Sequence, residues 1–149
     1  MDQCKVEQGN LFMRFSARVL ELCWQHRVPA TLEHPTCSRL WLCPPIQALR
    51  RKPHVTVVNT HYCAWGKPFK EPTAFLGVYI ALDRVGARKC LSKRLCHFTQ
   101  RPHVPVQGHR QDGTWRSGWK QCYPPALCKA LAKCFYDFEV QTIAYQFQR

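Results

Sequence analysis

The stretch that decides the fold class is Val28-Pro29-Ala30-Thr31-Leu32-Glu33-His34-Pro35. Its first five residues predict a short buried strand, because a proline is tolerated in a strand only near the start. Residues 10–26 precede it and predict an amphipathic helix capped by Asn10, since apolar side chains recur at three- and four-residue steps. These side chains are Leu11, Phe12, Phe15, Val19, Leu22 and Cys23. A helix followed by a strand favours an α/β fold with helices layered on a sheet.

Two more strands are predicted downstream. Residues 54–62 and 73–82 are rich in β-branched and aromatic side chains, which suit a pleated, half-buried surface. Before them, Ser38 can cap a short turn, and residues 46–51 can continue as a helix after Pro44-Pro45.

The last third of the chain begins irregularly. Glycines and prolines interrupt residues 84–118 and leave room only for short strands such as residues 104–107. Pro124-Pro125 then begins a helix, and residues 143–147 alternate like an edge strand. The apolar face of that helix is formed by Leu127, Leu131, Cys134 and Phe138.

The composition fits one folded domain. Of the 149 residues, 46% are hydrophobic and 21% are charged, which is ordinary for a globular protein with a core. We divide the chain into a leader (1–9), a partial domain (10–138) that contains an irregular basic segment (84–118), and a tail (139–149).

The N-terminus and the cysteines indicate where in the cell the protein is expected. Met1-Asp2-Gln3-Cys4-Lys5 is polar and no secretory signal follows it, and no apolar run approaches the roughly 18 residues that span a bilayer. We therefore expect an intracellular protein that is neither secreted nor in a membrane. Its 10 scattered cysteines are then expected to be free thiols, most of them small buried side chains, or metal ligands.

Charge gives the strongest compositional signal. The chain has 22 Lys and Arg against 9 Asp and Glu, a net charge of +13, and residues 84–111 contain seven cations and no carboxylate. One interpretation is a surface that contacts the phosphates of DNA or RNA. The others are a solvated basic face or a poorly evolved reading frame. Under the first interpretation the phosphate contacts come from Arg88, Lys89, Lys93, Arg94 and Arg101.

The basic segment also contains residues that could bind a metal. Cys90, Cys96 and His103 offer thiolate and imidazole ligands, and Cys63 could supply a fourth. A tetrahedral zinc ion would draw an irregular segment together. The spacing is not that of a standard zinc finger, and the alternative is a set of buried thiols and surface histidines.

Several motifs occur in an order that resembles one known family. Leu32-Glu33-His34-Pro35, followed by Ser38-Arg39-Leu40-Trp41, resembles the Glu-Asn-Pro or Glu-Asn-Val segment of DNA cytosine-5 methyltransferases, especially the divergent ones of phages and mobile elements. Residues 62–66 and 70–73 are similar to the Gln-Cys-x-Phe/Tyr-Gly and Arg-Lys-Pro-Thr stretch of those relatives. After Arg101-Pro102-His103 and residues 108–115, Tyr123-Pro124-Pro125 and the residues up to 132 resemble the Pro-Pro helix that ends these domains.

The resemblance implies a fold. It covers residues 10–135 and corresponds to the C-terminal half of a class I (Rossmann-like) methyltransferase sheet, with an irregular basic insert and a C-terminal helix. In the complete fold the parallel strands would be covered on both faces and flanked by the cofactor-binding strands. Half a sheet would leave apolar surface and a strand edge exposed, so the chain would self-associate or need a complementary N-terminal half.

The resemblance also implies a chemistry. In this family a cysteine thiolate attacks C6 of a flipped cytosine while a glutamate supports protonation at N3, and Glu33 matches that glutamate. The alternative role for Glu33 is a strand-end carboxylate that caps the following helix. His34 stands where the family has asparagine, and an imidazole cannot duplicate the paired donor and acceptor of a carboxamide.

Two parts of the family's machinery have no match. No Pro-Cys dipeptide, which holds the nucleophile, occurs in the chain, so we interpret Cys37 and Cys43 as packing residues. The glycine-rich loop that holds S-adenosylmethionine would have to lie well before residue 10, and Gly9 alone cannot form it. Without methyl donor, thiolate and base in proximity, this type of catalysis is not expected.

The basic loop and the aromatic residues have two interpretations each. Lys67, Lys70 and Thr73 lie where relatives support the site and the DNA backbone, and the alternative is a solvated turn. Aromatic side chains could stack on bases, although core burial is their commoner role. These are Trp65, Phe69, Trp115 and Trp119.

Three functional hypotheses follow. The first is a truncated methyltransferase-like protein that lacks independent methyl transfer and keeps a basic surface facing nucleic acid. The second is a basic nucleic-acid-binding module without chemistry, stapled by zinc. The third is a fragment of an active S-adenosylmethionine-dependent methyltransferase.

Overall fold

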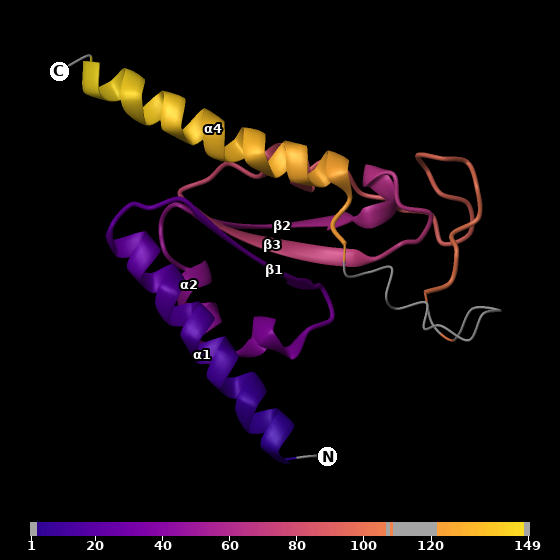
Figure 1. Cartoon of the computed structure of the whole chain (residues 1–149), viewed down its shortest axis with the longest axis horizontal. Helices are drawn as coiled ribbons and strands as arrows, with labels where there is room; N and C mark the ends of the chain where they lie inside the picture. The colour runs from indigo at the N-terminus through magenta and orange to yellow at the C-terminus, as the bar shows by residue number, and fades with distance from the viewer. Residues whose placement is uncertain (1–2, 107, 109–121, 148–149) are drawn as a thin grey trace.

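The fold is a small sheet with helices on both faces (Figure 1). The computed structural model describes residues 3–106, 108 and 122–147. Its elements are α1 (Gln3–Gln25), β1 (Ala30–Pro35), η1 (Arg39–Leu42), α2 (Pro44–Arg50), β2 (Val55–His61), η2 (Tyr62–Trp65), β3 (Pro72–Val78), α3 (Asp83–Gly86) and α4 (Pro125–Phe147). The predicted mixed α/β class and the C-terminal helix are confirmed.

The three strands pair in the order β1-β3-β2, and both pairings are antiparallel. Leu76 of β3 lies between Leu32 of β1 and Val57 of β2. The expectation of a parallel sheet was therefore wrong for these pairings. Residues 62–71 between β2 and β3 are too few for a parallel crossover, which needs about a dozen residues or more, so β3 returns antiparallel.

β1 and β2 nevertheless run parallel to each other, because each is antiparallel to β3. The connection between them, residues 36–54, is long enough to contain η1 and α2. β1 begins after Pro29 and carries Glu33 and His34 within it rather than beyond its end. The sheet is thus a crossover unit of two parallel strands with an antiparallel strand inserted between them.

β3 is the centre of the molecule, because it is buried from Thr73 to Val78 and contributes to two cores. On the face covered by α4, Phe75 packs with Tyr62, Ala64, Trp65, Phe69, Ile80, Leu82, Val85, Leu127 and Cys134. On the face covered by α1 and α2, Ala74, Leu76 and Val78 pack with Ala17, Leu20, Trp41, Ile46 and Leu49. Because successive side chains of a strand point to opposite faces of the sheet, those of β3 contribute alternately to the two cores.

Single residues determine where the two helices between β1 and β2 begin. The Ser38 hydroxyl accepts a hydrogen bond from the Leu40 N–H at 3.1 Å and caps η1, as predicted. Pro44 and Pro45 occupy the first turn of α2, where a missing N–H costs nothing.

The apolar face predicted for α1 was wrong. The helix begins no later than Gln3 and passes through Asn10, which therefore is not its cap. The buried residues of α1 are Ala17 and Leu20 instead. Most of the expected face is exposed to solvent: Leu11 65%, Phe12 61%, Phe15 66%, Val19 40% and Leu22 38%.

Contacts near the C-terminal end of α1 set its rotation. The Trp24 indole donates a hydrogen bond to the Pro53 carbonyl at 2.9 Å. Lys52 lies 3.8 Å from the centroid of the Trp24 ring and 2.5 Å from a Glu21 carboxylate oxygen. Glu21 and Trp24 share a helix face with Ala17, so these contacts turn Phe12 and Phe15 towards solvent.

α4 begins after Pro124, as predicted, but continues to Phe147. Leu127 and Cys134 are buried, with Leu131 and Phe138 partly buried, so its expected core-facing side is confirmed. The predicted edge strand at residues 143–147 was wrong. Residues 126–147 contain no glycine or proline to end the helix, and helical structure satisfies the backbone without a neighbouring strand.

We expect the exposed face of α1 to drive self-association at micromolar concentration, because clustered apolar side chains of this size favour a partner over water. Light scattering should show a mass above that of the monomer. Changing Phe12 and Phe15 to Glu should lower that mass, whereas Phe147→Glu on α4 should not. A monodisperse wild-type monomer with a cooperative melt would contradict this expectation.

Candidate metal centre and carboxylate site

Four metal-ligand side chains converge beside the end of β2. The ligand atoms of Cys63, Cys90, Cys96 and His103 all lie within 4.8 Å of one another, and the three cysteines are buried. The sequence predicted Cys90, Cys96 and His103 as ligands with Cys63 as the fourth, and the structure brings all four together. We call these residues the metal cluster; it could hold a metal ion.

Cys63 reaches the metal cluster from η2, the short helix that follows β2. All four residues of η2 are buried. Gly66 ends the helix in the left-handed region, with φ of 96°, where glycine has no steric penalty. The sharp turn at Gly66 keeps Cys63 facing the interior.

Cys96 and His103 are placed by a small irregular loop. The Cys96 N–H donates to the Arg101 carbonyl at 2.7 Å, and the Gln100 N–H donates back to the Cys96 carbonyl at 2.9 Å. An isolated bridge joins Leu95 to Pro102. Residues 87–106 otherwise lack helix and strand, as predicted, and residues 104–106 do not form the expected short strand; residue 107 lies outside the described residues.

Contacts from the sheet hold the start of this segment. The Cys90 N–H donates to His61 Nδ1 at 2.9 Å, and the Lys70 ammonium donates to the Ser92 carbonyl at 3.0 Å. The buried Thr60 hydroxyl donates to the Arg88 carbonyl at 2.6 Å. The backbone of residues 88–92 is therefore fixed to β2 and to the loop before β3.

The thiols differ in their tendency to ionise. Burial opposes ionisation of Cys96, but hydrogen bonds from the Thr99 hydroxyl, the N–H groups of Phe98 and Thr99, and His103 outweigh it and lower its pKa to about 6. Burial, followed by the nearby Cys90 and Cys96, raises the pKa of Cys63 to about 12. A cation among the three sulfurs would relieve this mutual repulsion.

The geometry fits a tetrahedral ion. Three sulfurs bound tetrahedrally would lie about 3.8 Å apart if each metal–sulfur bond is ~2.3 Å, and a nitrogen bound at ~2.0 Å would lie about 3.5 Å from each sulfur. His103 Nε2 already lies 3.5 Å from Cys90 Sγ, and no two ligand atoms lie more than 4.8 Å apart, so no separation needs to shorten by more than about 1.3 Å. The Nδ1 atom of His103 is buried and has no hydrogen-bond partner in the described part of the chain.

Glu33 forms a second site at the same end of the sheet. The Thr73 hydroxyl donates to one of its carboxylate oxygens, and the Tyr123 hydroxyl donates to the other at 2.9 Å. The rings of Tyr62 and Tyr123 lie 6.1 Å apart. The interpretation of Glu33 as a helix cap is wrong, because both of its oxygens accept side-chain hydrogen bonds and Ser38 caps η1. We call Glu33, Thr73, Tyr62 and Tyr123 the carboxylate site.

The tyrosines of the carboxylate site remain neutral. Burial, followed by the hydrogen bond to Glu33, raises the pKa of Tyr123 well above its usual range. Burial and the nearby Glu33 do the same for Tyr62. The carboxylate of Glu33 therefore faces donors that keep their protons at any physiological pH. His34, beside it in β1, has a buried Nδ1 without a hydrogen-bond partner among the described residues.

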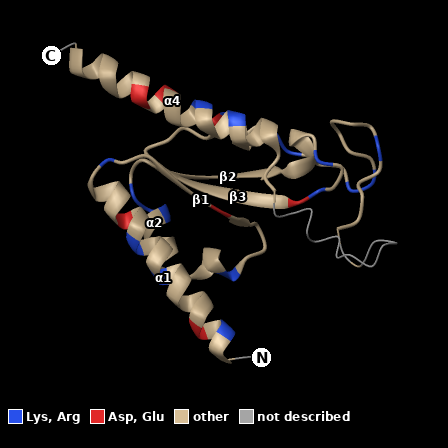
Figure 2. Ribbon diagram, viewed as in Figure 1, with Lys and Arg blue, Asp and Glu red and all other residues tan. Residues whose placement is uncertain are grey.

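The predicted basic contacts separate into two groups. Lys70 is held to Ser92, Thr73 is buried and binds Glu33, and Arg88 lies against aromatic rings. The remaining members are exposed, except Lys67, which is half-buried: Lys67, Lys89, Lys93, Arg94 and Arg101. Figure 2 shows the Lys and Arg residues of the described chain in blue and the Asp and Glu residues in red.

Some cysteines and aromatic residues lie elsewhere than expected. Cys37 is exposed, so its interpretation as a packing residue was wrong, whereas Cys43 is half-buried before α2. Trp65 and Phe69 are core residues, with 7% and 1% of their surface exposed, and cannot stack on bases. Trp115 and Trp119 lie outside the described residues.

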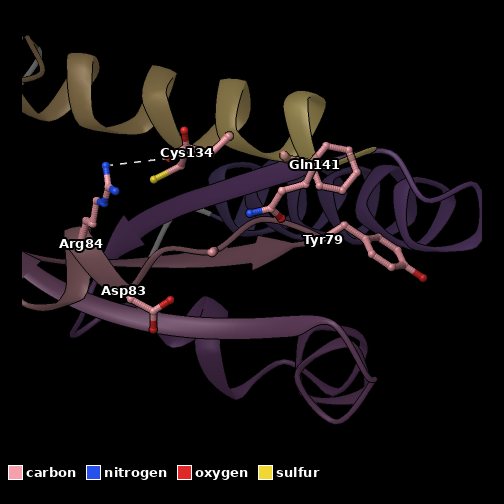
Figure 3. A pocket seen from close by; sticks show the side chains of 8 residues that line it. Tyr79, Asp83, Arg84, Cys134 and Gln141 are labelled. Carbon is pink, nitrogen blue, oxygen red and sulfur yellow. Dashed lines mark ion pairs between the residues drawn. The ribbon is translucent and has the colours of Figure 1, made fainter. Parts of the chain in front are cut away.

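A hollow that the sequence did not predict lies between α4 and the chain after β3 (Figure 3). Its volume is about 260 Å³, and its lining includes Tyr79, Asp83, Arg84, Cys134 and Gln141. Arg84 forms an ion pair of 3.8 Å with Asp137 across it. Because both charges of this pair are partly exposed, the pair contributes little to stability. Only packing between distant segments creates the hollow, so no sequence pattern could reveal it.

Metal binding can be tested with cobalt(II), whose tetrahedral thiolate complexes absorb strongly in the visible range. We expect one cobalt per chain and a rise in melting temperature on loading, because the metal cluster links segments that are distant in sequence. Cys96→Ser should abolish the spectrum. The matched change Cys37→Ser, at an exposed cysteine, should leave it intact. A spectrum unaffected by Cys96→Ser would contradict the assignment.

Comparison with known proteins gives no family. No family model, no curated protein and no solved structure matches the chain. In the part of the chain that the structure describes, no helix has both the length and the apolar character needed to cross a membrane.

Proposed function

We propose that this chain is a nucleic-acid-binding module whose basic segment is held by zinc. The observation that carries the proposal is the position of the metal cluster, which contains three ligands from the carboxylate-free segment, Cys90, Cys96 and His103. The cations of that segment lie around these ligands in sequence and are exposed. A metal at this place would hold a cationic surface in one conformation.

Zinc is the metal that the ligand set favours. Three thiolates and one imidazole form a common structural zinc site, and soft thiolate ligands disfavour magnesium and calcium. All four tetrahedral positions would be taken by protein side chains, so no position remains for water or a substrate. The zinc would therefore have a structural rather than a catalytic role.

A polyanion is the partner that the charges favour. Lys89, Lys93, Arg94 and Arg101 are exposed, and no carboxylate occurs among residues 84–111 to neutralise them. Cations held close together repel one another, and bound phosphates would relieve this repulsion. The counterions that the nucleic acid releases on binding would favour the complex further.

The test is binding of labelled nucleic acid, measured by fluorescence anisotropy over a range of salt concentrations. We expect affinity to fall steeply with salt, and Arg94→Ala to reduce the slope of log K against log salt by about 1. Arg50→Ala, at the exposed end of α2, is the matched control and should change neither affinity nor slope. Removing the metal with a chelator should weaken binding. An affinity that is independent of salt would rule out phosphate contacts as its source.

A second candidate function is favoured by the carboxylate site. Residues of four separate segments that resemble methyltransferase motifs meet there: Glu33, Tyr62, Thr73 and Tyr123. The crossover from β1 through α2 to the parallel β2 is also a connection expected in a class I methyltransferase sheet. We propose on these grounds that the chain is a methyltransferase-like half-domain.

In that role Glu33 would recognise a flipped cytosine. Its carboxylate is oriented by the Thr73 and Tyr123 hydroxyls, which would preorganise it for a hydrogen bond with the base. S-adenosylmethionine would supply the methyl group, but this chain offers neither a Gly-x-Gly loop nor a Pro-Cys nucleophile. A second polypeptide segment would have to provide both.

We expect no methyl transfer to DNA by this chain alone, because the thiolate that must attack the base is missing. Incorporation of radiolabelled methyl groups from S-adenosylmethionine should stay at background. Incorporation above background that Glu33→Ala abolishes and Glu7→Ala, at an exposed residue of α1, preserves would show that the chain is an enzyme.

A further inference from the structure

Three large apolar side chains are exposed around the metal cluster. Leu91 follows the ligand Cys90, Leu95 precedes the ligand Cys96, and Phe98 comes two residues later. Their exposed fractions are 78%, 50% and 43%. The ligands of the metal cluster hold this segment without burying these three side chains in an apolar core. Their exposure to water is nevertheless unfavourable.

Cations alternate with these apolar residues. Lys89, Lys93, Arg94 and Arg101 are exposed on the same short segment, whose ends are drawn together by Cys90, Cys96 and His103. A surface of this kind offers ionic contacts and apolar contacts side by side.

Phe98 is held in place by its neighbours. The Arg88 guanidinium lies near two aromatic rings, 4.7 Å from the centroid of Trp65 and 5.5 Å from that of Phe98. Trp65 is fixed in the core by a 2.8 Å hydrogen bond from its indole to the Thr60 hydroxyl. The His97 ring lies 6.0 Å from Phe98 and is tilted by 45° to it. The phenyl ring is therefore positioned before any ligand binds.

A positioned aromatic ring on a segment that also exposes several cations matches the chemistry of single-stranded nucleic acid. In a single strand the faces of the bases are free to stack on an aromatic side chain while Lys and Arg contact the phosphates. In a duplex these faces are covered by neighbouring base pairs, and only the groove edges are open. Phosphate contacts alone would leave Leu91, Leu95 and Phe98 without partners.

From these contacts we infer that the segment of residues 89–103, which the metal cluster holds, binds single-stranded DNA or RNA, with Phe98 stacking on an unpaired base. This inference rests on the proposed nucleic-acid-binding function and names its substrate class. Leu91 and Leu95 add apolar contacts beside the stacked base, and the cations follow the backbone.

The test compares three labelled ligands of one sequence on the zinc-loaded full chain: a DNA single strand, the RNA equivalent and the DNA duplex. We expect either single strand to bind at least about tenfold more tightly than the duplex. Phe98→Ala should weaken single-strand binding by about fivefold or more, the lower end of the effect of losing one base stack. Phe98→Tyr, which keeps a ring, should preserve it.

Two controls make the outcome decisive. Phe98→Leu keeps an apolar side chain and removes only the ring, so it should weaken single-strand binding even if Phe98→Ala unfolds the segment. Phe147→Ala, at an exposed phenylalanine of α4, should have no effect. Duplex binding as tight as single-strand binding, or full affinity in Phe98→Leu, would overturn the inference and leave the proposed function standing. Absence of binding to all three ligands would overturn both.

Discussion

The burial of η2 is the constraint on which both sites depend. Tyr62, Cys63, Ala64 and Trp65 are all buried, and three of these side chains also contact residues outside η2 that matter for the sites. Tyr62 lies against Tyr123 of the carboxylate site, Cys63 enters the metal cluster, and Trp65 supports Arg88. In a helix of three residues per turn, Tyr62 and Trp65 lie one turn apart on the same side and Cys63 points in another direction, so one buried turn fixes the relative position of three groups of contacts. A shift of η2 would disturb the carboxylate, the ligand set and the aromatic contacts of Phe98 together.

The sheet makes this arrangement possible because β3 is buried on both faces. Phe75 contributes to the core under α4, and Leu76 contributes to the core under α1 and α2. The short connection from β2 to β3 forms η2 and the loop before Thr73, so the residues that leave β2 and enter β3 lie next to each other. Glu33, opposite Phe75 in the register of β1 and β3, is then within reach of the Thr73 hydroxyl. The antiparallel strand that departs from the expected parallel sheet is therefore what completes the carboxylate site.

Sequence reasoning succeeded where the signal was local. Pro44-Pro45, Pro124-Pro125 and Ser38 mark helix starts through the chemistry of single residues, and all three predictions are confirmed. It failed where tertiary contacts decide between alternatives. The apolar residues of α1 offered one face, but Trp24 and Lys52 fixed another. Two other errors did have a signal in the sequence: the connection of residues 62–71 is too short for a parallel crossover, and residues 126–147 contain no residue that breaks a helix. Cys63 could be named as a ligand only as a candidate, because nothing in its spacing shows that η2 turns it towards Cys90 and Cys96.

A basic segment such as residues 88–106 is poorly ordered by charge, since its cations repel one another and it contains no carboxylate of its own. Apolar packing reaches it at Val106, which lies against the core under α4, but Leu91, Leu95 and Phe98 are exposed rather than packed inside. What remains is a small number of strong, directional contacts: the four ligands of the metal cluster and the hydrogen bonds that reach it from Thr60, His61 and Lys70. A metal ion orders such a segment from within through its ligands and leaves the outward side chains free. The apolar and cationic groups on its surface are thereby available for a ligand, which is the arrangement a binding segment requires and a purely structural loop does not.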